Sequence, residues 1–543
     1  MTQVLRLCAD YVDRLAVLDP VHASMLGIGA GYGAATDYDP DGYAARADLI
    51  RATLAELGRL PVTSPVDRRA ADHLRERLQA EQAWHASDEP LRLLRAPYGV
   101  VSRLRDSVEL LPRGDDEQWR GVAARLAAVP GMLASWRTSL GLGLQRGLAA
   151  ARRQALESAV QAERYAVGTH DRLVAAYGEG PLAGRLTAAA EAAHAGYAET
   201  ARYLRADYAP RAAASDAVGA ERYAVAARLC LGADIDPVEA YEWGWEELHR
   251  IEAELAHEAS RVHPGASVDE ATEHLGRTQY VVGHDAYRGW LQDRHDQAIG
   301  ELHGAHFDIA APLRVVEVTL EPDSTSGSAY YTPPSEDLTR PGRTWWPIGG
   351  RERFATWKEL TVVFHEGVPG HHLEIGATRV AGERLSRFAR FSGVPGHGEG
   401  WALYAERLMA DLGFLDDPAD YLGMLDGQSL RAARVVLDIG VHCGLPAPAE
   451  VGGGAWNYDK AWQFLSAHAN VAEEFLRFEL DRYLGWPGQA PSYKIGERLW
   501  LQLREDARAK EGDAFDLKAF HRKALDIGSV GLDVLRAAVL GEI

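Results

Sequence analysis

The stretch that decides the fold and the site is Lys358-Glu-Leu-Thr-Val-Val-Phe-His365-Glu366-Gly-Val-Pro-Gly-His371-His372-Leu-Glu374. An apolar segment with helical periodicity ends in a His-Glu pair, a Pro-Gly dipeptide follows, and two more histidines come next. Further along, Gly398-Glu399-Gly-Trp-Ala-Leu-Tyr-Ala-Glu406 opens a second helical segment. Catalytic zinc takes three protein ligands, commonly imidazoles and a carboxylate, and keeps one position open for water. The two segments therefore predict one Zn²⁺ ion held by His365, His371 and Glu399.

The spacing of these histidines departs from the usual helix of zinc hydrolases. In the common His-Glu-x-x-His pattern, two histidines four residues apart share one helix face. Here His371 lies six residues after His365, and His372 lies seven after it. On an unbroken helix, six residues rotate the side chain by about 240°, and seven carry it about 10 Å along the axis. Pro369-Gly370 should end the helix and let the chain turn, because proline disfavours helix before it and glycine accepts unusual dihedrals. We predict that His371 returns beside His365, with His372 as the alternative ligand.

Glu366 is the predicted general base. A bound metal lowers the pKa of its water, and a nearby carboxylate takes the proton as that water attacks a carbonyl group. Glu406 shares a helix face with Glu399 and has two open interpretations, either orienting a ligand histidine from behind or facing solvent. The alternative for the whole stretch is a helix C-terminus that carries histidines, which suit the negative end of the helix dipole. The second carboxylate segment favours the metal site.

The composition limits the classes of function. The chain has 543 residues, 47% of them hydrophobic, and a formal net charge of −20, which argues against nucleic acid and anionic membranes as partners. No apolar run reaches the roughly 18 residues of a membrane span, and the first residues lack a signal-peptide pattern. The three cysteines, Cys8, Cys230 and Cys443, are far apart and indicate a reducing compartment. We expect a cytoplasmic protein that binds a small peptide or amide substrate.

The rest of the chain predicts a mainly α fold. Residues 67–230 carry apolar positions three and four apart, and Pro112, Pro130 and Pro210 break them into an antiparallel helical stack. We assign residues 1–232 to an N-terminal helical region that forms one wall of a cleft, and residues 233–543 to a catalytic zinc-binding region. One continuous domain, 1–543, is the alternative.

A small β-sheet is expected beside the zinc helix. The segment 306–320 alternates apolar and polar residues, and Tyr330-Tyr331 begins a second extended segment. An extended edge in this place can bind a peptide by strand addition. A purely structural sheet is the equal alternative.

Two further segments supply candidate site residues. In the predicted helix 429–442, Arg434, Asp438 and His442 recur every four residues and form a polar stripe. We expect Arg434 and Asp438 to form a structural ion pair, and we take His442 as a candidate catalytic residue. Tyr493 stands at the start of a later helix, where its hydroxyl can stabilise an oxyanion or simply pack.

These motifs resemble the bacterial family catalogued as domain of unknown function 885. The segments that carry the resemblance are His365–His372, Glu399–Glu406, Tyr330–Pro334, Ser429–His442 and Gly488–Gly496. Together with Tyr11-Val-Asp-Arg and Asp37-Tyr-Asp-Pro40, they extend it over nearly the whole chain.

The resemblance implies a large helical gluzincin-like metallopeptidase fold, similar to thimet oligopeptidase and the zinc carboxypeptidases. The tubulin tyrosine carboxypeptidases are similar in the stretched His-Glu-to-His spacing and in the Glu-Gly motif that follows. The same resemblance supports His365, His371 and Glu399 as zinc ligands, Glu366 as the base and Tyr493 as the oxyanion tyrosine.

The sequence therefore predicts a zinc metallopeptidase-like hydrolase that cleaves an amide or peptide bond in a short peptide or an aminoacylated small molecule. One alternative is a metal-dependent tailoring enzyme of a natural product, either a lyase or an amidohydrolase. Another is a non-catalytic binding protein that retains the metal site. The substrate, endo- or exo-cleavage, the native metal and the oligomeric state stay open at this point.

Overall fold

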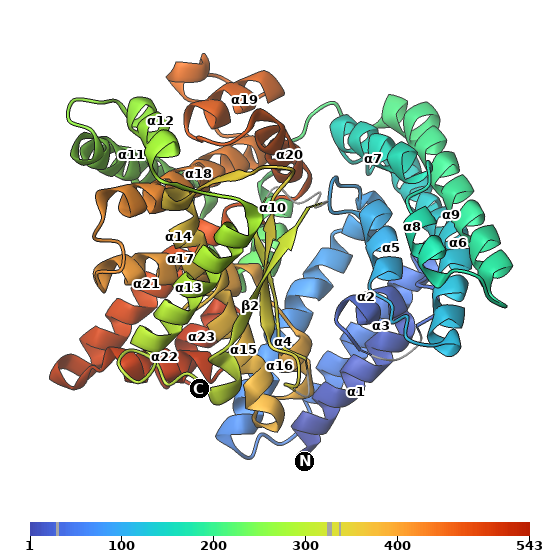
Figure 1. The fold of residues 1–543 in the computed structure, drawn as a ribbon. Coiled ribbons are helices and arrows are strands. Elements are labelled where there is room, and N and C mark those ends of the chain that lie inside the picture. Colours follow the sequence, from blue (N-terminus) through green and yellow to red (C-terminus); the bar gives the residue numbers. More distant parts are fainter. Residues whose placement is uncertain (29–31, 323–327, 336–337) are drawn as a thin grey trace.

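The structure is a computed structural model that describes residues 1–28, 32–322, 328–335 and 338–543. It is mainly helical with small sheets, as predicted from the sequence. In Figure 1 most helices of the N-terminal part lie on one side, α4 (Pro65–Ala86) runs through the middle beside α15 (His371–Ala381) and α16 (Arg387–Phe391), and the strands and most later helices lie on the other side. In the described part of the chain, no helix is both long and apolar enough to cross a membrane.

Ten helices come from the N-terminal part of the described chain, and several begin with a side-chain cap followed by proline. Asp19, Asp39 and Ser64 each accept a backbone N–H at the start of a helix whose first residue is proline, a position that needs no hydrogen bond from its nitrogen. The helices are α1 Gln3–Leu18, α2 Pro20–Met25, α3 Pro40–Leu57, α4 Pro65–Ala86, α5 Val100–Glu109, α6 Asp116–Gln145, α7 Arg152–Tyr165, α8 Asp171–Tyr177, α9 Ala183–Tyr203 and α10 Ala220–Leu231.

Pro130 does not break the stack, contrary to the prediction. Helix α6 runs through it without interruption. Residues Leu126, Val129 and Leu133 on either side are fully buried, so packing holds both turns although proline removes one backbone donor. Tertiary packing here outweighs the local preference of a single residue.

The catalytic candidates lie in the second part of the chain. Its helices are α11 Pro237–Val262, α12 Val268–Thr278, α13 His284–Leu302, α14 Thr356–Glu366, α15 His371–Ala381, α16 Arg387–Phe391, α17 Pro395–Asp411, α18 Pro418–Cys443, α19 Tyr458–Ala467, α20 Glu473–Gly485, α21 Ser492–Glu511, α22 Leu517–Leu525 and α23 Leu532–Val539. Helices α17 and α21 cross at two glycines: a Cβ added at Gly400 would lie 2.4 Å from the carbonyl carbon of Gly496. This close approach places the first turn of α21 against the helix that carries Glu399.

The described strands form two small sheets. Strands β1 Tyr280–Val282 and β5 Arg353–Ala355 pair antiparallel. In the second sheet, β4 Gly342–Pro347 lies between the parallel β2 Val316–Glu321 and the antiparallel β3 Tyr330–Thr332. The strand predicted from residue 306 begins only at Val316, because Pro312 has no N–H for a ladder and its segment forms a short 3₁₀ turn. Strand β3 is an edge of its sheet.

Among the described residues, three hydrophobic clusters form the interior. The largest joins the helices and strands of residues 223–540, the second lies within residues 21–209, and the third joins α1, α3 and α4 with Phe388 of α16. The third cluster therefore ties the N-terminal helices to the second part of the chain. The division at residue 232 stays a prediction.

Candidate metal centre

The helix is interrupted between the two predicted histidine ligands. Helix α14 ends at Glu366 and α15 begins at His371. The Val368–Pro369 peptide bond is cis. The Gly370 N–H donates to the carbonyl of Phe364 at 3.0 Å, and a Cβ at Gly370 would lie only 2.0 Å from the carbonyl oxygen of His365. Only glycine fits such a tight reversal.

A third helix holds this turn from outside. The indole N–H of Trp401, a fully buried residue of α17, donates to the carbonyl oxygen of Pro369 at 2.8 Å. Helix α17 also carries Glu399. The turn and the carboxylate are therefore positioned by the same element.

His365, His371 and Glu399 converge. One ligand atom from each lies within 4.8 Å of the others. The Nε2 atoms of the two histidines are each 3.5 Å from Oε2 of Glu399, and the rings stand nearly perpendicular at 86°. Metal bonds of about 2.0–2.1 Å in a tetrahedral site place ligand atoms about 3.4 Å apart, so the two histidine–carboxylate distances fit.

One oxygen of this set also lacks a hydrogen-bond donor in the described part of the chain and could bind a cation instead. Oε2 of Glu399 is buried and receives no hydrogen bond from the described residues. Burial acts to raise the pKa of Glu399, but His365 and His371 outweigh it and hold that pKa well below its usual value. The three residues present therefore fit a divalent metal with mixed nitrogen and oxygen ligands.

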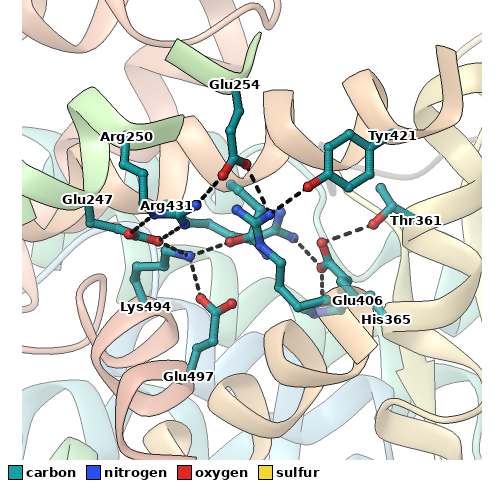
Figure 2. Close-up of polar contacts among 12 residues, drawn as sticks. Glu247, Arg250, Glu254, Thr361, His365, Glu406, Tyr421, Arg431, Lys494 and Glu497 are labelled. Carbon is teal, nitrogen blue, oxygen red and sulfur yellow. Dashed lines mark hydrogen bonds and ion pairs between the residues drawn. The ribbon is translucent and has the colours of Figure 1, made fainter. Parts of the chain in front are cut away.

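Glu406 holds His365 from behind (Figure 2). The Nδ1–H of His365 donates to Oε1 of Glu406 at 2.7 Å, which leaves Nε2 facing Glu399. Glu406 is fully buried, accepts a 2.9 Å hydrogen bond from Thr361 and lies 3.6 Å from the guanidinium of Arg431. The solvent-facing interpretation of Glu406 is wrong. Such a carboxylate fixes the tautomer and orientation of a ligand histidine.

The charge on His365 follows from these contacts. Burial acts to lower the pKa of His365, but the neighbouring carboxylates of Glu399 and Glu406 outweigh it and raise the pKa to about 9. A metal ion must displace that proton, because only neutral imidazole binds a metal.

A second buried charge cluster lies beside this one (Figure 2). Lys494 of α21 is 1% exposed and its ammonium lies 2.8 Å from Glu247 of α11. It also contacts Glu497 of the same helix α21 and Gln428 of α18. Lys494 thus joins three helices at the residue next to Tyr493.

Glu366 and Tyr493 share one cavity with the three candidate ligands. The cavity has a volume of about 480 Å³, and His365, Glu366, His371, Glu399 and Tyr493 all line it. Burial raises the pKa of Glu366, as a base that works near neutral pH requires. Strand β3 contributes Tyr330 and Tyr331 to the wall, so the predicted extended edge does reach this space.

Tyr493 lies near both Glu399 and a pair of arginines. Burial raises its pKa, the carboxylate of Glu399 raises it further, and Arg482 and Arg434 act against the rise. The guanidinium of Arg434 stands 4.9 Å from the centre of the phenol ring. The phenol therefore stays protonated at neutral pH and has a donor available.

His442 is not brought to this cavity. It is fully buried, its Nε2–H donates to the carbonyl of Tyr483 at 3.0 Å, and it does not line the cavity. Burial lowers its pKa to about 4. His442 follows Asp438 by four residues and Arg434 by eight, so it shares their helix face, but it is buried in the core.

His372, the alternative ligand, is engaged elsewhere. One ring nitrogen lies 3.0 Å from the hydroxyl of Tyr331 and the other 3.0 Å from the carbonyl of Leu313. Both nitrogens therefore have partners, and His372 ties α15 to the three-stranded sheet.

The expected ion pair between Arg434 and Asp438 is wrong. The guanidinium of Arg434 lies 2.7 Å from Glu479 of α20 instead. Asp438 accepts the Gly488 N–H at 2.9 Å. Helical spacing shows which residues share a face, but it does not show which partner a neighbouring helix offers.

Sequence reasoning missed a group of residues that complete the cavity. Among them are Tyr98, Phe478, Glu479, Arg482 and Trp486. Tyr98 comes from the N-terminal part of the chain, and the others come from α20 and the residues after it. The one local signal was Glu479 and Arg482, three apart on a helix, a spacing that predicts an ion pair but not a site.

Comparison with known proteins agrees with the fold. The family model described as "Bacterial protein of unknown function (DUF885)" matches residues 20–539. The chain belongs to this family. No curated protein matches it significantly.

Two solved structures share the architecture of this DUF885 member. One, described as "the putative lipoprotein from Colwellia psychrerythraea", has a TM-score of 0.85 and 20% identity, over 99% of this chain and 98% of that one. Another, described as "a putative lipoprotein of unknown function from Shewanella oneidensis", has a TM-score of 0.78 and 17% identity, over 99% of this chain and 100% of that one. At such identities the likeness establishes the fold alone.

Proposed function

We propose that this DUF885 protein is a gluzincin-like zinc hydrolase that cleaves an amide bond in a short peptide or an aminoacylated small molecule. The observation that carries the proposal is the convergence of His365, His371 and Glu399 across a broken helix, with Glu366 in the same cavity. A zinc ion in this set supplies a Lewis acid and acidifies bound water.

The chain's own residues supply the other parts of the reaction. Glu366 takes a proton from the attacking water and passes it to the leaving amine, a role suited to a buried carboxylate with a raised pKa. Tyr493 donates its phenol hydrogen to the oxygen that becomes negative when the carbonyl is attacked. Glu406 keeps Nε2 of His365 directed at the centre through the hydrogen bond to Nδ1. The cavity of about 480 Å³ suits short substrates.

Replacement of the base tests this proposal. Glu366→Gln keeps the size of the side chain but cannot accept the proton, so kcat should fall by about 10²–10⁴-fold while bound zinc, measured by atomic absorption, stays the same. The substrates are a panel of N-blocked dipeptides and aminoacylated amines, each assayed with and without chelator. Glu383→Gln, an exposed residue beyond α15, is the matched control. Hydrolysis that persists in Glu366→Gln or in the presence of chelator contradicts the proposal.

A natural-product tailoring enzyme is the second candidate, since the same metal and base serve other substrates. Mass spectrometry of the products separates hydrolysis from a lyase reaction, because only hydrolysis adds a water molecule across the cleaved bond.

For the compartment we propose the cytoplasm. The described thiols Cys8, Cys230 and Cys443 are free, as a reducing compartment permits. The descriptions of both structural relatives make the cell envelope the alternative. Fractionation of cells decides between them, and recovery of the protein with the envelope would contradict the cytoplasmic assignment.

A further inference from the structure

Three arginines line the wall of the cavity beyond Tyr493. Arg431 and Arg434 come from successive turns of α18, and Arg482 comes from α20. Arg431 lies 3.6 Å from Glu406 behind the candidate metal ligand. Arg434 and Arg482 instead share one carboxylate, that of Glu479, at 2.7 and 2.6 Å.

The shared carboxylate leaves a positive charge without a partner. Arg434, Arg482 and Glu479 are each less than 8% exposed. Two guanidinium groups and one carboxylate sum to one net positive charge, and none of the described carboxylates other than Glu479 forms an ion pair with Arg434 or Arg482. An uncompensated buried cation is costly, so this part of the cavity favours an anionic ligand.

Donor atoms are available for that anion. Nε of Arg434 donates to the hydroxyl of Tyr483 and one Nη donates to Glu479. Its other Nη has no acceptor among the described residues. Arginine is well suited to carboxylates, because its planar fork matches their geometry.

Arg434 lies close to the tyrosine that is assigned to the reacting bond. The Arg434 guanidinium stands 4.9 Å from the ring of Tyr493. That phenol is the donor assigned to the carbonyl oxygen under attack. An anion on Arg434 would thus lie close to the phenol that is assigned to the scissile amide.

We propose that Arg434 and Arg482 bind the free α-carboxylate of the residue that leaves, so that the enzyme removes C-terminal residues or splits dipeptides. The proposal rests on the hydrolytic function above. In the reaction, water adds to the carbonyl carbon and the C–N bond breaks. The acyl part leaves as a carboxylate, and the last residue leaves as a free amino acid that has gained a proton on its nitrogen.

The neighbouring wall indicates which residue leaves. Phe475, Phe478 and Trp486 line the cavity on the same side as Arg482, and Tyr98 stands 6.0 Å from Phe478 and 6.2 Å from Trp486, ring to ring. Such a surface contacts an apolar or aromatic side chain favourably.

Matched substrates test the carboxylate subsite in the zinc-loaded wild-type protein. The probes are N-blocked dipeptides that end in phenylalanine as the free acid, in phenylalanine amide, or in glutamate amide, whose only carboxylate is in the side chain. The free acid should have a kcat/KM at least tenfold above that of either amide, as expected when a charged hydrogen-bonded pair is lost. Equal rates for the acid and phenylalanine amide, or preference for glutamate amide, overturn the proposal.

Variants assign the effect to the named residues. Arg434→Gln and Arg482→Gln should each bring the ratio of kcat/KM for the acid to kcat/KM for phenylalanine amide close to one, whatever the absolute rate on the amide becomes. Arg477→Gln, on the exposed face of the same α20, is the control and should keep the preference. The opposite result, an unchanged acid preference in both cavity variants, contradicts the assignment.

A binding measurement separates this proposal from the hydrolytic one. In chelator-treated protein, calorimetry compares N-acetylphenylalanine with its amide, so that neither metal nor turnover contributes. The acid should bind at least tenfold more tightly, and Arg434→Gln should abolish the difference. Tighter binding of the acid without hydrolysis of any peptide would defeat the proposed function but keep the subsite; equal or undetectable binding of both defeats the subsite.

Discussion

The hydrogen bond from His365 to Glu406 determines which imidazole nitrogen faces the cavity. Without it the ring can rotate and the other tautomer becomes accessible, so the nitrogen opposite Glu399 is no longer fixed. We expect Glu406→Gln to weaken zinc affinity by about 10–100-fold, measured by competition with a chromogenic chelator. Glu383→Gln serves again as the control. Unchanged affinity would show that a neutral acceptor orients His365 as well as the carboxylate does.

Tyr493 should act on the transition state rather than on substrate binding. Tyr493→Phe removes the hydroxyl and keeps the ring beneath Arg434. We expect kcat to fall by about 10²–10³-fold with KM nearly unchanged, as when one donor to an oxyanion is lost. Tyr280→Phe, on the exposed strand β1, is the control and should keep the wild-type kcat. A change confined to KM would assign Tyr493 to substrate binding instead.

At the scale of elements, the sequence predicted those features that depend on residues close together in the chain. The break at Pro369-Gly370 followed from the backbone limits of proline and glycine, and rotation per residue showed that an unbroken helix could bring neither His371 nor His372 beside His365. The residues involved are neighbours in the chain, and the backbone nearly fixes their relative geometry.

The rest depended on partners distant in sequence. Arg434 pairs with Glu479, 45 residues away on α20, and Tyr98 reaches the cavity from the other half of the molecule. Pro130 was wrongly expected to end a helix because the buried residues around it cannot be recognised from local propensity. Without knowledge of which helices pack together, the arginine wall has no signature in the sequence.

The close crossing of α17 and α21 positions both Glu399 and Tyr493, so one substitution there should affect both residues. Gly400→Ala forces a Cβ to within 2.4 Å of the Gly496 backbone, which must separate the helices that carry Glu399 and Tyr493. We expect a loss of about 1–3 kcal/mol in the free energy of unfolding and a parallel loss of zinc affinity. Gly289→Ala in α13, where nothing lies within 4 Å of the new Cβ, should be neutral or slightly stabilising. Denaturant unfolding and chelator competition measure both. Wild-type values for Gly400→Ala would contradict the close crossing.

For the whole molecule, the buried histidines predict a dependence of stability on pH. Burial lowers the pKa of His442 to about 4 and those of His73 and His521 to about 3. In the unfolded chain a histidine has a pKa of about 6.5. Below pH 6.5 the unfolded chain therefore binds protons that the folded protein does not, and stability falls as the pH drops from 6.5 towards 4. One such histidine accounts for about 2 kcal/mol at pH 5.

Thermal unfolding between pH 7 and pH 4.5 tests this dependence. His442→Gln keeps an N–H donor for the Tyr483 carbonyl but cannot be protonated, so its Tm should fall less steeply with pH than that of the wild type. His257→Gln, at an exposed position, should leave the slope unchanged. Identical slopes for all three proteins would mean that His442 does not contribute.

The turn between α14 and α15 has a consequence for protein engineering. Its two imidazoles are joined by five residues, yet the reversal is held by an indole of α17, which also brings the carboxylate. A synthetic peptide that copies residues 365–371 lacks that support and should be a weak chelator. Transplanting this centre into a designed scaffold will require three packed helices rather than one grafted loop.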